Sequence, residues 1–177
     1  MADLNLPLAG RSAGTDRAPR AEPIWNVIEL LFFAYRDFTG DPDDVLAKLG
    51  FGRAHHRVLH FVDRLPGLTI AELLDILRIT KQSLNRVLRD LIEAGFIEQR
   101  AGVSDRRRRL LVTTKRGEAL ARELASVQSA RIAQALAQSG EATRDAIVRF
   151  LAGMVGEGDR AHVLELVARG RINALHR

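Results

Sequence analysis

The 177-residue sequence contains no cysteine. Without a thiol, the chain has no disulfide, no thiolate metal site, no cysteine nucleophile and no thiol-based redox sensor. It also has no run of about 18 apolar residues, so no membrane-spanning helix is predicted. The first residues do not combine a basic segment with a long apolar one, as a secretory signal does. We therefore expect a cytoplasmic protein without a membrane partner.

Patterns typical of catalytic sites are also missing from the sequence. There is no glycine-rich phosphate loop, and no nucleophile stands beside a convincing base. His55, His56 and His60 are close in sequence. The pair His56 and His60 has helical spacing but lacks the further ligands that a zinc site needs. The sequence therefore predicts no metal, no cofactor and no enzymatic activity.

Positive charge is concentrated in one region. The net formal charge is +5, yet residues 78–116 contain eleven Lys or Arg against four Asp or Glu. Four consecutive arginines, 106–109, lie in this stretch and precede an apolar segment. A local positive field is expected where a protein binds a polyanion. A solubilising loop is the alternative interpretation of the arginines, but repulsion within the run disfavours it.

Most of the chain has the apolar periodicity of helices. The first apolar segment begins at Pro23 and is expected to end at the turn-forming residues 39–42. Thr69 and Glu72 have the form of a capping box, and Thr80 is a suitable N-cap for the next helix. The predicted helices are 23–38, 53–65, 70–77, 81–94, 115–138, 141–155 and 160–168, and the predicted strands are 96–100 and 109–113.

The order of helix, short helix, helix and hairpin predicts a winged helix-turn-helix. Helix 81–94 has one apolar stripe and a polar face that fits the major groove, where Arg pairs with guanine and Gln or Asn with adenine. The arginine-rich tip is expected to bind the minor groove or phosphates. Asp105 is either a generic turn residue or, as we favour, fixes the shape of the tip by pairing with Arg107 or another basic residue of the wing. The predicted DNA-binding residues are Thr80, Lys81, Gln82, Ser83, Asn85, Arg86, Arg89, Asp105, Arg106, Arg107, Arg108 and Arg109.

Several motifs resemble the MarR family, the multiple-antibiotic-resistance type of bacterial repressor. Residues 51–59 and 68–74 resemble the family's second and third helices, and the likeness covers about residues 24–170. The hairpin motifs are Gly-Phe-Ile-Glu-Gln-Arg (95–100), Asp-Arg-Arg (105–107) and Leu-Leu-Val-Thr-Thr-Lys-Arg-Gly (110–117).

The resemblance implies a mainly α-helical protein with a small β-hairpin wing, which binds a pseudo-palindromic operator in double-stranded DNA as a homodimer. In the family, N-terminal and C-terminal helices interlock as a dimerisation region. The chain then divides into a disordered tail (1–22), an N-terminal dimerisation helix and connection (23–50), the winged helix-turn-helix (51–114), and a linking helix with C-terminal dimerisation helices (115–177).

The family often has a small-molecule pocket between the dimerisation region and the DNA-binding lobe. We expect a small aromatic or carboxylic effector there, contacting Trp25, Tyr35, Arg53 and His56, with Arg53 or His56 pairing with its charge. Trp25, Phe32 and Tyr35 are alternatively part of a dimer core, an interpretation favoured for Phe32, whereas Trp25 and Tyr35 also suit the pocket. Two alternatives stay open: a constitutive DNA binder without an effector, and a winged-helix module that binds proteins instead of DNA.

Overall fold

The computed structural model describes residues 22–102, 105, 107–140 and 143–175. The predicted disordered tail therefore lies outside the described residues except for its last position, and so does Arg106. The described residues form α1 (Trp25–Ala47), α2 (Arg53–Arg64), β1 (Leu68–Thr69), α3 (Ile70–Leu77), α4 (Lys81–Glu93), β2 (Ile97–Ala101), β3 (Arg109–Thr113), α5 (Lys115–Ser139), α6 (Thr143–Met154) and α7 (Glu157–Leu175).

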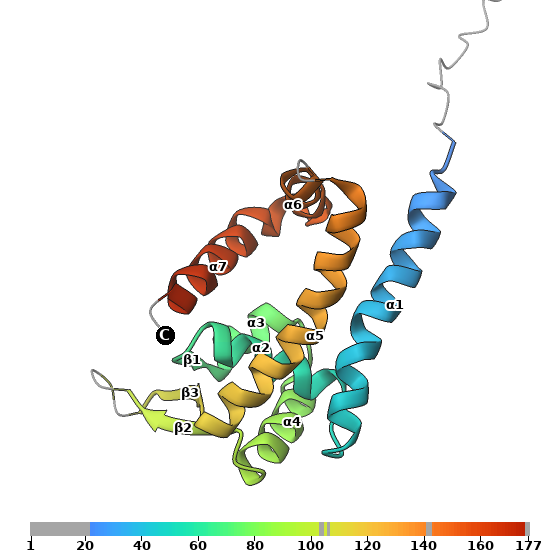
Figure 1. The fold of residues 1–177 in the computed structure, drawn as a ribbon. Helices are drawn as coiled ribbons and strands as arrows, with labels where there is room; N and C mark the ends of the chain where they lie inside the picture. Colours follow the sequence, from blue (N-terminus) through green and yellow to red (C-terminus); the bar gives the residue numbers. More distant parts are fainter. Residues whose placement is uncertain (1–21, 103–104, 106, 141–142, 176–177) are drawn as a thin grey trace, which may run out of the picture.

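A compact lobe contains α2, α3, α4 and the small sheet (Figure 1). Helix α5 leaves this lobe alongside α1, and α6 and α7 return so that α7 ends near β1 (Figure 1). Because α1 and α5 pack against each other as well as against α2, the extended part is joined firmly to the lobe. The predicted mainly helical fold with a small wing is confirmed.

The core of the lobe is built from stripes of leucine and valine. In α4 the buried residues are Leu84, Val87, Leu88 and Leu91, the spacing of one helix face. Burial of each such side chain contributes about 1.5–3 kcal/mol. Gly117 lets α5 start against this core, because a Cβ there would clash with the carbonyl oxygen of Phe96.

The sheet has a third strand that the sequence did not predict. Its order is β1-β3-β2, and both pairings are antiparallel, with Leu68 opposite Leu111. Strand β1 is only two residues long, too short to give an alternating pattern. The predicted capping box follows it directly: the Glu72 N–H donates to Thr69 Oγ1 at 3.3 Å, and the Thr69 N–H donates to Glu72 Oε2 at 2.7 Å.

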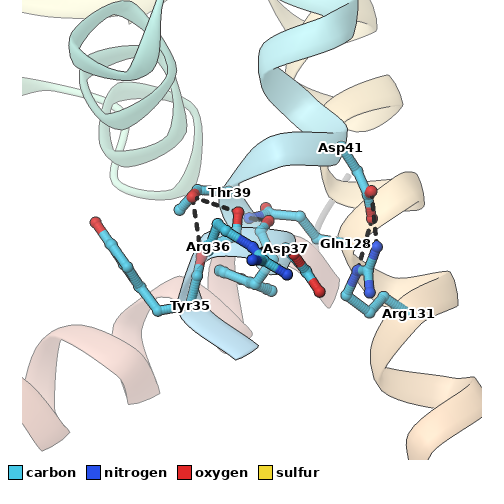
Figure 2. A network of polar contacts seen from close by, with 8 residues as sticks. Tyr35, Arg36, Asp37, Thr39, Asp41, Gln128 and Arg131 are labelled. Atoms are coloured by element: carbon cyan, nitrogen blue, oxygen red, sulfur yellow. Dashed lines mark hydrogen bonds and ion pairs between the residues drawn. The ribbon is translucent and has the colours of Figure 1, made fainter. Parts of the chain in front are cut away.

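The predicted end of the first helix at residues 39–42 was wrong, because α1 continues through Pro42 to Ala47. Proline has no N–H for the carbonyl four residues earlier, which belongs to Phe38. In the structure Gln128 of α5 donates to that carbonyl at 3.4 Å. Next to it, Arg131 binds both carboxylate oxygens of Asp41 at 2.7 and 2.8 Å (Figure 2). Contacts from α5 therefore support α1 where proline weakens it.

The C-terminal helices differ from the prediction in their limits. Helix α7 begins at Glu157 and runs to Leu175, although the sequence predicted only residues 160–168. Gly158 and Gly170 are accommodated inside this helix instead of ending it. None of the described helices is both long enough and apolar enough to cross a membrane.

Candidate nucleic-acid interface

The N-terminus of α4 is fixed by Thr80. Its hydroxyl accepts the Ser83 N–H at 3.2 Å and lies 2.9 Å from the Ser83 hydroxyl. The preceding turn places Arg78 at φ 52°, the left-handed region. The cap and the turn together orient the start of α4, so Thr80 and Ser83 have a structural role there whatever else they contact.

The polar face of α4 is open to solvent. Within the described part of the chain, the side chains of Lys81, Gln82, Asn85 and Arg86 have no hydrogen bond or ion pair. Arg89 has only a 3.9 Å contact with Asp90. The predicted residues are brought together along a broad groove: Lys81, Gln82, Ser83, Asn85, Arg86 and Arg89, all exposed.

A histidine that the sequence suggested only as a doubtful metal ligand connects α2 with α4. His55 Nδ1 accepts the Gly52 N–H at 3.2 Å, so its Nε2 carries the proton and donates to Asp90 Oδ2 at 3.2 Å. The His55 ring also stacks on Phe51, with centroids 4.6 Å apart. Because Asp90 is on α4, this contact holds α4 against α2. His55 and Asp90 are 35 positions apart, so no local sequence pattern indicated their contact.

The wing tip is held by hydrogen bonds that Asp105 accepts from backbone N–H groups. Its Oδ1 accepts the Arg107 N–H at 2.9 Å, and its carbonyl accepts the Arg108 N–H at 3.1 Å. Gly102 is needed beside it, since a Cβ there would lie 2.7 Å from the Asp105 carbonyl oxygen. Asp105 therefore binds the backbone N–H of Arg107 and not its guanidinium. The side chains of Arg107, Arg108 and Arg109 are all exposed to solvent.

A separate pocket of about 250 Å³ lies between α1 and α2, next to Gln128 of α5. It brings together three of the four predicted effector contacts, Tyr35, Arg53 and His56. Trp25 does not line it and is 62% exposed near the start of α1. Trp25 and Tyr35 are ten positions apart, almost three turns along one helix, which explains the separation.

The charges of this α1–α2 pocket are only partly balanced. Arg53 Nε donates to Asp43 Oδ2 at 2.6 Å, whereas the buried Asp43 Oδ1 has no hydrogen-bond partner among the described residues. Burial lowers the pKa of His56, and the charge of Asp43 opposes part of that effect. His56 is therefore mainly neutral at neutral pH and is able to gain charge when an anion binds.

The capped helix with its free polar face and the basic hairpin beside it define a winged helix-turn-helix DNA-binding protein. A family model described as the MarR family matches residues 49–108. The transcriptional regulator PetP of Rhodobacter capsulatus is 46% identical over 135 residues, which cover 76% of this chain and 81% of PetP. The chain belongs to the MarR family of transcriptional regulators, and the resemblance found in the sequence is confirmed.

Two further proteins resemble the chain in sequence or in fold. The Mycobacterium tuberculosis repressor Rv2887 is 37% identical over 93 residues, 52% of this chain and 67% of its own. Its structure with p-aminosalicylic acid has a TM-score of 0.54 and 28% identity, covering 76% of this chain and 99% of that one. Streptococcus pneumoniae FabT in complex with DNA has a TM-score of 0.65 at 17% identity, covering 75% and 94%, and shows the shared fold.

Proposed function

We propose that this regulator is a homodimeric, sequence-specific repressor in the bacterial cytoplasm, without enzymatic activity, which a small carboxylic effector releases from DNA. The observation that carries the DNA-binding part is the exposed face of α4, whose Gln82, Asn85 and Arg86 side chains have no partner among the described residues. Such groups suit the edges of base pairs in the major groove. The name of Rv2887 as a repressor supports the direction of regulation.

The proposed dimer rests on apolar side chains that one chain leaves uncovered. Phe32 of α1 is 71% exposed and Phe150 of α6 is 51% exposed. Further exposed apolar residues lie on these two helices and on α7: Ile24 at the N-cap of α1, Trp25, Leu30, Leu31, Phe33 and Tyr35 on α1, Val148, Leu151 and Met154 on α6, and Leu164, Val167 and Ile172 on α7. A surface of this extent is unusual on a monomer and marks an interface. A two-fold dimer would place two α4 helices about 34 Å apart on a pseudo-palindromic site.

A winged-helix module that binds proteins is the alternative. Such a module would present apolar side chains at the wing and on the exposed face of α4. Here the described wing tip carries Arg107, Arg108 and Arg109, and the face of α4 carries Lys81 and Arg86. Positive charge at the wing tip and on α4 favours DNA over a protein as the binding partner.

Replacing the four wing arginines 106–109 with glutamine tests the role of the wing. We expect the slope of log binding constant against log salt concentration to become shallower by about one unit for each phosphate that the wing no longer neutralises. The measurement is fluorescence anisotropy of a labelled duplex at several salt concentrations. The control removes two exposed arginines of α6, with Arg144→Gln and Arg149→Gln, and should keep the slope. A slope unchanged in the wing variant would contradict phosphate binding by the wing.

The α1–α2 pocket is the proposed effector site, and its binding should depend on pH. The pKa of His56 lies below its usual range because of burial. A bound carboxylate favours the charged imidazole, so binding takes up a proton. Affinity for p-aminosalicylate should therefore increase severalfold as pH falls from about 8 to about 5.5. Asp43, Arg53, Arg57 and His60 also face this region.

His56→Gln is the variant that isolates this effect. It should bind p-aminosalicylate with little dependence on pH, as measured by isothermal titration calorimetry in two buffers of different ionisation enthalpy. His162→Gln, on helix α7 and outside the lining of the α1–α2 pocket, should behave like the wild type. If His56→Gln keeps the full pH dependence, the effector's charge is not next to His56.

A further inference from the structure

A second and larger cleft lies between α7 and the helices α2 and α3. Its volume is about 470 Å³, within the usual range for small-molecule sites. The lining is mainly apolar and includes Phe61 and Leu65 of α2, Ile76 of α3, and Val163 and Leu166 of α7. It contains none of the residues assigned above to DNA, and of the α1–α2 pocket it shares only His60 and Phe61.

Arg64 supplies the cleft with a positive charge. Its guanidinium lies against α7, where a Cβ at Gly170 would be 3.3 Å from Arg64 Nη2 and 3.5 Å from Nε. Gly170 is buried, so the absence of a side chain there makes room for the guanidinium. Within the described ranges this head group has no hydrogen bond and no ion pair, and it is half-buried.

The other charges around the cleft are largely matched. Arg78 Nη2 lies 2.7 Å from Asp159 Oδ1, and His162 Nε2 lies 3.6 Å from Asp75 Oδ2. Arg171, which also lines the cleft, adds a further positive charge. Asp159 is therefore paired with Arg78, and the three arginines of the lining outnumber its two carboxylates, so the excess charge of the cleft is positive.

We propose that this cleft binds an organic monoanion with an apolar body, of the type of a medium-chain carboxylate, with Arg64 pairing with the head group. The apolar lining supplies the hydrophobic contribution, and a guanidinium forms two parallel hydrogen bonds to a carboxylate. The occupant contacts α7 on one side and α2 and α3 on the other. It therefore joins the C-terminal helices to the DNA-binding lobe, next to the effector pocket, with which the cleft shares His60 and Phe61.

The test uses decanoate as the probe and the full-length protein. Isothermal titration calorimetry should show decanoate binding to the wild type, while Arg64→Gln should weaken it about tenfold, which corresponds to about 1.4 kcal/mol. Decanol, which has the same chain without the charge, should bind the wild type and Arg64→Gln equally weakly. Val163→Trp, which fills the cleft from α7, should abolish decanoate binding. Thermal unfolding of both variants checks that they are folded.

Arg53→Gln is the matched control, because it removes a guanidinium from the α1–α2 pocket instead. Decanoate binding that depends on Arg53 and not on Arg64 would overturn this inference and place the anion in the effector pocket. An absence of binding to the wild type would also overturn it, as would a cleft filled by the partner subunit in a dimer structure. Operator binding, measured separately without decanoate, tests the proposed DNA-binding function independently.

Discussion

Replacing Arg86 with alanine should weaken binding to the specific operator by about 1–3 kcal/mol, roughly five- to 150-fold, and leave binding to random duplex nearly unchanged. Arg86 is exposed on the N-terminal half of α4, and no described residue bonds its side chain. The substitution should therefore remove an interaction with a base and little else.

Selection of bound duplexes from a random pool provides the operator for this measurement. Anisotropy titrations at one fixed salt concentration then compare the operator with a scrambled duplex. Lys48→Ala removes an exposed positive charge at the end of α1 and should leave both affinities unchanged. Equal weakening of both duplexes by Arg86→Ala would show that Arg86 binds phosphate instead of a base.

Replacing Phe32 with glutamate should convert the proposed dimer into a monomer and reduce operator affinity by a hundredfold or more. Phe32 is 71% exposed in one chain, so the substitution costs the isolated chain little. In a dimer it would bury an unpaired carboxylate, which is strongly unfavourable. A monomer also loses the advantage of binding two half-sites at once.

Sedimentation equilibrium at micromolar concentration measures this directly. Leu49→Glu is the matched control, since Leu49 is also an exposed apolar residue, at 39%, but lies beyond the end of α1. It should remain dimeric. A dimeric Phe32→Glu protein would show that this face of α1 is not the interface.

Local signals explain what the sequence predicted well. The caps at Thr69 and Thr80 depend on residues three positions away, and the buried stripe of α4 repeats within one helix. The limits of α4 and of strand β3 followed from such patterns. The order of helix, short helix, helix and hairpin along the chain was sufficient to predict the fold class, because few folds share this order.

Contacts between distant residues explain what the sequence did not predict. The continuation of α1 beyond Pro42 is supported by the hydrogen bond from Gln128 to the Phe38 carbonyl. The position of α4 is supported by the His55–Asp90 contact. The cleft under α7 requires Gly170 to meet Arg64 across more than a hundred residues. No periodicity or short motif contains this information, since each pairing exists only after the helices have packed.

The continuity of α1 has a mechanical consequence for the regulation of DNA binding. The helix carries the exposed Phe32 near one end and the fully buried Leu46 near the other. At 1.5 Å per residue its 23 residues extend over about 35 Å. A tilt of about 5° at the apolar end would then move the other end by about 3 Å, close to the rise of one base pair along B-DNA. Because Gln128 and Arg131 support α1 around Pro42, small changes in the packing of the proposed dimer would change the separation of its two α4 helices.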